Sequence, residues 1–421
     1  MVSLLIIVFL LGYLAIVLEH TIGVNKTASA LITGISCWVI VALGSENPSS
    51  VLPQLSHHLS GISEILFFLL GAMTIVEVID SHYGFRKITS LIRTKSPIGL
   101  MWIISWAAFF LSAILDNLTT AIVMASIVRK MVPDRSWKLY IISMVVIAAN
   151  AGGAWSPIGD VTTTMLWVGG QIETIPLVSM VFLPSLVSLL VPLLLLSFVL
   201  KNENSDLGEP IEQEKMTDGA KWVLMAGAGG LLLVPVFKNL THLPPYLGIL
   251  LVLGVIWVLT ETIHSGKEAH EKSVLTPSHA LSKIDTPSIL FFLGILLAVA
   301  ALESAEVLKT AATWLDGFTS DKAIIMAAIG IASAIVDNVP LVAASIGMYD
   351  LSLFPANNPM WIELAFAAGT GGSILIIGSA AGVAVMGLEK IDFMWYLKKI
   401  AWLALAGFVA GYLLLVLLLE F

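Results

Sequence analysis

The chain has 421 residues, of which 58% are hydrophobic and only 12% are charged, and its mean hydropathy is +0.96. A water-soluble domain of this composition would expose large apolar patches, so the sequence predicts an all-α polytopic membrane protein. The net charge of −8 says little about partners, because the acidic excess lies largely in two polar linkers, and no basic patch indicates nucleic-acid binding. Cys37 is the single cysteine, which excludes an intramolecular disulfide.

Apolar runs long enough to span a bilayer as helices predict the crossings of the chain. Two further apolar stretches, at 98–130 and 322–349, each fit either two crossings or a re-entrant hairpin. Basic residues flank the first stretch on both sides, and because cytoplasmic loops are rich in Lys and Arg, we expect a hairpin that enters and leaves on one side. The predicted crossings lie at residues 2–18, 27–44, 62–80, 139–169, 176–200, 220–237, 246–264, 287–303, 359–388 and 393–420.

Polar linkers at 201–219 and 265–286 divide the chain into segments. We expect N-terminal scaffold helices in residues 1–61 and a first repeat in 62–200. The linkers and two central helices then occupy 201–286, and a second repeat occupies 287–421.

Three sequence blocks of the first half recur in the same order in the second half. "EILFFLLGAMTIVEVID" at 64 resembles "SILFFLGILLAVAALES" at 288, and "ILDNLTTAIV" at 114 resembles "IVDNVPLVAA" at 335. The third pair is "AANAGGAWSPIGDVTTTM" at 148 and "AAGTGGSILIIGSAAGVA" at 367. Apolar composition alone is an alternative explanation for the first pair. An odd number of crossings separates each block from its copy, so we expect inverted repeats, the usual construction of secondary transporters.

Each predicted hairpin carries Asp-Asn at its tip, at 116–117 and 337–338, and each is followed by an apolar helix that we expect to break at a glycine pair, 152–153 or 371–372. Such a break is tolerated at membrane depth only where protein or a water-filled cavity satisfies the freed backbone groups. Half-helix carbonyls, hydroxyls, amide oxygens and carboxylates form a shell of hard oxygen ligands. This shell predicts a site for Na⁺ or Li⁺ near the membrane midplane.

The acids of these blocks are Asp116, Asp160 and Asp337. A carboxylate buried without a cation is expected to hold a proton, and an arriving Na⁺ favours the ionised form and releases that proton. A site that binds H⁺ or Na⁺ but not both performs antiport. Asp160 is also a candidate helix cap, because Ser379 takes its place in the second repeat. The neighbouring polar residues, including Thr120, Ser373 and Ser379, are either ligands or ordinary caps.

The strings "SAILDNLTTA", "AANAGGAWSPIGDVTTTMLW" and "IVDNVPL" closely resemble the NhaD-type sodium/proton antiporters of the ion transporter superfamily, over essentially residues 62–400. The resemblance implies a multi-pass protein of the bacterial inner membrane that exports Na⁺ or Li⁺ for H⁺ and serves pH homeostasis. It also implies a homodimer among membrane lipids, in which a transport domain moves past a scaffold as an elevator. Proton and cation binding is then assigned to Asp116, Asn117, Thr119, Asn150, Ser156, Asp160, Thr162, Thr163, Asp337 and Asn338, with the three acids as Na⁺ ligands.

Other functions remain open at this stage. A sodium-coupled carboxylate symporter or an oxyanion exporter would share the scaffold, although dicarboxylate carriers have serine where these hairpins have aspartate. An intramembrane aspartyl protease also uses two membrane aspartates, but Pro157 stands where its motif has glycine. A channel has no need of alternating-access symmetry. We therefore expect a transporter, without enzymatic activity and without a cofactor beyond the transported Na⁺ or Li⁺ and H⁺.

Overall fold

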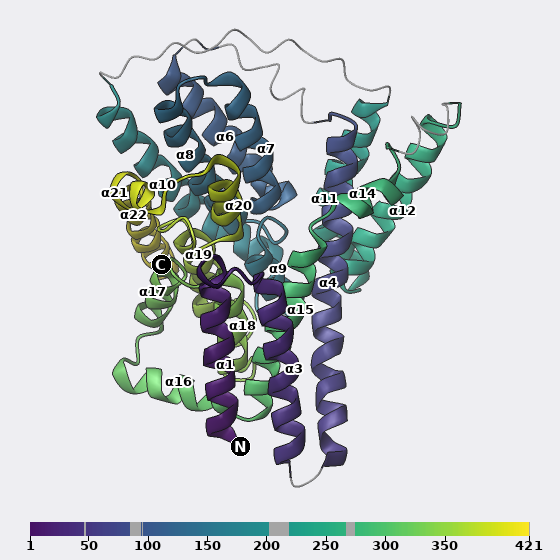
Figure 1. Cartoon of the computed structure of the whole chain (residues 1–421), viewed down its shortest axis with the longest axis vertical. Helices are drawn as coiled ribbons and strands as arrows, with labels where there is room; N and C mark the ends of the chain where they lie inside the picture. Colours follow the sequence, from purple (N-terminus) through teal and green to yellow (C-terminus); the bar gives the residue numbers. More distant parts are fainter. Residues whose placement is uncertain (46–47, 85–93, 95, 202–218, 267–273, 421) are drawn as a thin grey trace.

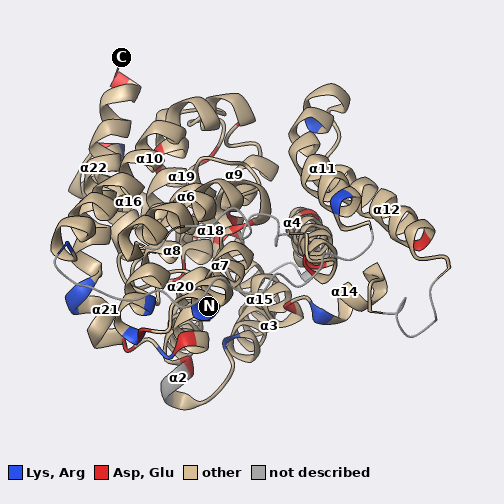
Figure 2. Ribbon diagram, turned by 90° about the horizontal axis from the view of Figure 1, so that it is seen from above, with Lys and Arg blue, Asp and Glu red and all other residues tan. Residues whose placement is uncertain are grey.

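The computed structural model describes residues 1–45, 48–84, 94, 96–201, 219–266 and 274–420, and the regular elements of these ranges are all helical (Figure 1). Nine of the described helices are long and apolar enough to cross a membrane. Most of the basic flank expected at 81–97 and most of the linker at 201–219 lie outside the described residues. Seen from above, charged residues are sparse along the helices (Figure 2).

The helices follow the chain in the order predicted by the apolar runs. They are α1 (Val2–Val17), α2 (Glu19–Ile22), α3 (Lys26–Gly44), α4 (Val51–Ser81), α6 (Pro97–Leu115), α7 (Asn117–Met131), α8 (Arg135–Ala154), α9 (Val161–Val168), α10 (Thr174–Val199), α11 (Ala220–Thr241), α12 (Pro245–Ile263), α14 (Pro277–Lys283), α15 (Thr286–Ser304), α16 (Val307–Phe318), α17 (Lys322–Ala332), α18 (Asn338–Met348), α19 (Pro359–Gly371), α20 (Ala380–Glu389), α21 (Phe393–Lys399) and α22 (Ala401–Glu420).

Equivalent elements of the two halves make equivalent contacts. Helix α6 packs on α8 as α17 packs on α19, and the halves meet where α8 contacts α19 and α10 contacts α22. The hydroxyl of Ser112 donates to the carbonyl of Ala149 at 2.6 Å, and in the second half Ser333 donates in the same way to Ala368 at 3.0 Å. The structure therefore repeats its internal contacts as well as its sequence blocks.

The glycine pairs allow neighbouring backbones to approach. A Cβ on Gly152 would lie 2.1 Å from the carbonyl oxygen of Phe109, and one on Gly371 would lie 2.0 Å from that of Gly330. Helix α19 ends at the glycine pair as expected, but α8 continues to Ala154, so the expected break at 152–153 is wrong by a residue or two. Close helix packing, more than chain breaking, explains glycine at these positions.

Other elements also differ from the expected crossings, among them α14, which lies within the expected linker 265–286. Helix α4 begins at Val51, earlier than the expected start at residue 62. The polar residues of 56–60 lower the hydropathy of its first turns, so these turns do not appear as an apolar run, but they do not break the helix. Helix α16 was not expected as a separate element. It is amphipathic, burying Leu308 and Ala312 while Lys309 stays exposed, and it is too short to cross a membrane. The last expected crossing is divided at Ile400 into α21 and α22.

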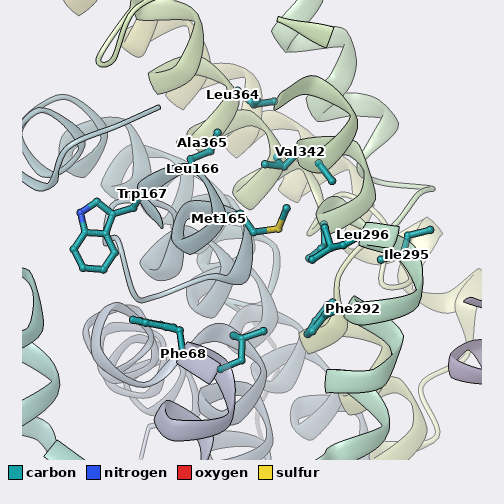
Figure 3. Packing of buried hydrophobic residues seen from close by; sticks show 14 of the residues in the cluster. Phe68, Met165, Leu166, Trp167, Phe292, Ile295, Leu296, Val342, Leu364 and Ala365 are labelled. Carbon is teal, nitrogen blue, oxygen red and sulfur yellow. The ribbon is translucent and has the colours of Figure 1, made fainter. Parts of the chain in front are cut away.

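Buried apolar side chains connect the two halves around α9 (Figure 3). Phe68 of α4 contacts Trp167 of α9 edge-on, with ring centroids 6.3 Å apart. Met165 of the same short helix lies in one cluster with Leu296 of α15 and Val342 of α18. This packing holds the second half of the first broken helix against the second hairpin.

Helices α4, α11 and α12 pack together on one side of the molecule (Figure 1). His82 after α4 and His264 after α12 are both buried, and their Nε2 atoms lie 2.9 Å apart. The ring of His82 also uses Nδ1 against the carbonyl of Val78 at 2.7 Å. This pair fastens the ends of α4 and α12 to each other.

We expect Gly152→Ala and Gly371→Ala each to destabilise the protein by about 1–3 kcal/mol, because the added methyl group would overlap a backbone carbonyl that cannot move freely. Gly254→Ala is the matched control, since a Cβ there meets nothing within 4 Å. That change should be neutral or stabilising by about 0.5–1 kcal/mol. Melting temperatures of the detergent-purified variants measure these effects, and equal stability of all three would contradict the packing described here.

Candidate functional site

Asp116 forms the whole connection between α6 and α7. Its backbone has φ 97° and ψ 158°, a conformation that non-glycine residues adopt only where the surrounding structure imposes it. Its carboxylate caps α7, with Oδ1 accepting from the Thr119 N–H and Oδ2 from the Thr119 hydroxyl, each at 2.8 Å. Both carboxylate oxygens at the first hairpin tip are therefore engaged by neutral donors.

Asp160 lies in the break between α8 and α9 and is only 1% exposed. Its Oδ1 accepts hydrogen bonds from the backbone N–H and the hydroxyl of Thr162, both at 2.8 Å, so it caps α9. Its Oδ2 accepts from the Asn117 side-chain amide at 2.5 Å. The expected capping role and a contact with the hairpin tip thus occur together in one residue.

A buried amide network extends from this acid into the second repeat. Asn117 Nδ2 also contacts Asn150 Oδ1 at 3.0 Å. Asn150 Nδ2 then donates to the hydroxyls of Ser373 and Ser379, each at 2.9 Å. Ser379 caps α20 by accepting from the Gly382 N–H at 3.2 Å, which is the role that Asp160 plays for α9. The two broken helices therefore share one network of hydrogen bonds at equivalent positions.

Two hydroxyls of the predicted site donate to backbone carbonyls in and around the first break. Ser156 donates to the carbonyl of Ala113 on α6 at 2.6 Å. Thr163 donates to the carbonyls of Ser156 and Asp160 at 2.8 and 2.9 Å. In the described part of the chain, the carbonyls of Ala113 and Ser156 accept no α-helical N–H, whereas that of Asp160 also accepts the first backbone bond of α9, from the Thr164 N–H at 2.9 Å. The hydroxyl bonds help to fix the conformation of residues 155–160.

The second hairpin tip is built differently. Asp337 caps α18 through Oδ1, which accepts from the Val339 N–H at 3.2 Å, while its Oδ2 lies 3.5 Å from Nζ of Lys26. Asn338 is 3% exposed, and its Nδ2 has no hydrogen-bond partner among the described residues. Pro340 stands where the first tip has Thr119 and offers neither an N–H nor a hydroxyl.

The three acids lie near one another but do not chelate one point. The charges of Asp116 and Asp337 both act on Asp160. Within the described ranges, no group of three Asp, Glu, His or Cys side chains has the arrangement of a metal centre. The region does offer carboxylate, amide, hydroxyl and carbonyl oxygens, which are the ligands that hard cations prefer.

Comparison with known proteins places the chain in a family. A family model described as citrate transporter matches residues 3–361. Sodium/proton antiporters 1 and 2 of Arabidopsis thaliana are 51% and 48% identical, over 96% of this chain and 70% and 97% of theirs. The Na⁺/H⁺ antiporter NhaD of Alkalimonas amylolytica is 30% identical, over 93% of this chain and 86% of its own. The chain belongs to the citrate transporter family and, within it, to the NhaD-type sodium/proton antiporters.

A solved structure supports the fold of this NhaD-type chain. The YdaH transporter of Alcanivorax borkumensis, whose crystal structure is described as having an unusual topology, matches 90% of each chain with a TM-score of 0.52. The sequence identity is 11%, so the likeness concerns the fold alone.

The structure brings together some of the predicted site residues of the NhaD-type chain and separates others. Asn117, Asn150 and Asp160 share direct hydrogen bonds, whereas Asp116 bonds to Thr119 and Asp337 faces Lys26. Sequence reasoning did not identify Lys26. The two partners are 311 positions apart, and no local pattern relates them.

We expect Asn117→Ala to lower the melting temperature of this NhaD-type protein. The change leaves Asp160 Oδ2 and Asn150 Oδ1 buried without a donor, which costs about 1–3 kcal/mol or more where the acceptor is charged. Ser105→Ala is the control, because its buried hydroxyl has no partner among the described residues and its removal breaks no observed bond. An Asn117→Ala protein as stable as Ser105→Ala would show that the network does not stabilise the site.

Proposed function

We propose that the protein is a secondary active antiporter that exports Na⁺ or Li⁺ in exchange for H⁺ by alternating access. The observation that carries the proposal is the buried carboxylate of Asp160. It lies in a broken helix, is hydrogen-bonded to one hairpin tip, and is joined through Asn150 to the second broken helix. The antiporter names of relatives at 48–51% identity support the same function.

Exchange follows from competition for carboxylate oxygens. Asp160 now accepts hydrogen bonds at both oxygens, which suits its ionised form. If a proton binds to Oδ2 of Asp160, its O–H points at the N–H of Asn117, and two donors then face each other. The side-chain amide of Asn117 must rotate to relieve this. Asn117 would then present its oxygen to the acid, and Asn150 would have to respond, because it bonds to the same amide group. Protonation and cation binding thereby favour different arrangements of one network.

A carboxylate symporter is the second candidate, and the citrate transporter description of the matching family model favours it. The second break offers a serine cap, Ser379, at the start of α20, where an anion could meet helix N–H groups. The acids at both hairpin tips oppose this assignment, since they would repel a carboxylate. Uptake measurements with citrate or succinate separate the two functions.

The remaining features of the proposal come from the family resemblance. The hairpins and broken helices would form a transport domain that moves as an elevator past a scaffold, in a homodimer without enzymatic activity. The protein is a multi-pass membrane protein. Residence in a bacterial inner membrane belongs to the proposal, because relatives occur both in bacteria and in a plant.

We expect purified protein in liposomes loaded with a pH dye to move protons when Na⁺ is added. Asp160→Asn should abolish the exchange, because an amide cannot alternate between a proton and a cation. Asp116→Asn and Asp337→Asn should reduce it at least about tenfold if each acid stabilises the bound cation by more than 1.4 kcal/mol. Asp350→Asn is the control, since that acid is exposed in the loop after α18.

The proposal is overturned if the three variants exchange as fast as the Asp350→Asn protein. Citrate or succinate uptake that needs Na⁺ and proceeds without proton counterflow would establish the symporter instead.

We also expect the half-saturating Na⁺ concentration to rise as the pH falls. Protons and Na⁺ compete for the same oxygens, so acidification adds competitor and weakens apparent Na⁺ binding. Displacement of one proton per Na⁺ gives a change of up to about tenfold per pH unit on the acid side. Exchange rates measured across Na⁺ concentrations at several pH values test this. A half-saturating concentration independent of pH would exclude direct competition.

A further inference from the structure

The ammonium group of a lysine lies beside the carboxylate of one of the candidate cation-binding acids. Nζ of Lys26, at the start of α3, lies 3.5 Å from Oδ2 of Asp337, with the side chains 21% and 15% exposed. The same ammonium lies 4.5 Å from the centre of the Phe291 ring of α15. Lys26 is thus held by an acid of the second hairpin and by an aromatic face of a neighbouring helix.

The two hairpin tips differ in the donors that reach their acids. At the first tip, Thr119 supplies an N–H and a hydroxyl, one to each oxygen of Asp116. At the second tip, Pro340 takes the equivalent place and supplies neither, so neutral donors leave Oδ2 of Asp337 open. The charged side chain of Lys26 approaches that oxygen, at a distance longer than the bonds of the first tip.

Polar atoms beside this ion pair also lack partners. Nδ2 of Asn338 and the hydroxyl of Tyr13 of α1 are buried without a hydrogen-bond partner within the described part of the chain. Tyr13 lies within electrostatic range of Asp337. A buried donor without an acceptor is costly, so this region is suited to receive water or another hydrogen-bond acceptor beside the ion pair.

We propose that Lys26 is a resident cation that competes with the transported cation for Asp337, and so helps to set the affinity of the antiporter for Na⁺. The inference rests on the proposed antiport function. Without Na⁺, the ammonium compensates the charge of Asp337. When Na⁺ binds at Oδ2, the ammonium must leave, because two cations at one carboxylate oxygen repel each other. Part of the free energy of Na⁺ binding is therefore spent on releasing Lys26.

The test compares Lys26→Gln with Lys26→Arg in full-length protein reconstituted in liposomes. We expect Lys26→Gln to lower the half-saturating Na⁺ concentration roughly fivefold, the effect of losing an ion pair at the upper end of the range for partly exposed pairs. Lys26→Arg keeps the charge and should stay closer to wild type. Lys283→Gln is the matched control, because Lys283 forms a similar ion pair with Glu77, at 3.8 Å, outside the hairpins.

A double substitution separates competition from a merely structural role. If Lys26 acts through Asp337, then Asp337→Asn and Asp337→Asn with Lys26→Gln should have the same half-saturating Na⁺ concentration. A structural role would instead lower the melting temperature and leave the Na⁺ dependence of Lys26→Gln equal to that of wild type. That result overturns the inference and leaves antiport intact, whereas a wild-type protein without Na⁺-driven proton movement would overturn the proposed function itself.

Discussion

The cost of burying a carboxylate governs the organisation of this molecule. A carboxylate inside a membrane domain is stable only if hydrogen-bond donors, a proton or a cation compensate its charge. Asp160 obtains donors from Thr162 and Asn117, Asp116 obtains them from Thr119, and Asp337 obtains one N–H and an ammonium. The backbone donors come from the first turn of the helix that each acid caps, and side chains of other elements, Asn117 for Asp160 and Lys26 for Asp337, complete the compensation. The hairpin turns and the first helix break therefore bring hydrogen-bond donors to the acids.

The repeats share an architecture but differ in charge. Ser379 replaces Asp160 at the second break and still caps its helix, so the cap is retained while the charge is lost. Asn150 donates to a serine hydroxyl of the second repeat and accepts from the Asn117 amide of its own repeat. This asymmetry concentrates acid chemistry in the first break while the second contributes neutral partners. The two halves therefore share a frame, and different residues at single equivalent positions make their sites unequal.

Sequence patterns predicted the helix boundaries at which polar residues interrupt an apolar run. Asp-Asn within an apolar run marked the starts of α7 and α18, and Asp160 before a threonine run marked the start of α9. Re-entry of the first hairpin on one side stays a prediction, because α6 alone is long and apolar enough to cross a membrane. The amphipathic helix α16 was missed because apolar residues alternate there with polar ones over too short a length for a crossing. The role of Gly152 as a contact with Phe109 depends on a neighbouring helix, and the pairing of Lys26 with Asp337 depends on the whole fold. Neither is encoded within one segment.

The acids at the two hairpin tips differ in how easily their present partners can be displaced by a cation. Asp116 is held by two short bonds from one threonine, so a cation arriving there must displace donors that are covalently fixed beside it. Asp337 is paired with a flexible side chain from a distant helix at 3.5 Å, and an ammonium can withdraw without unfolding the cap of α18. Under the proposed antiport function, the second tip is therefore the easier place for a cation to bind. Under the same proposal, Asp160 couples the exchange to the second repeat through its hydrogen bond to Asn117, which also bonds to Asn150.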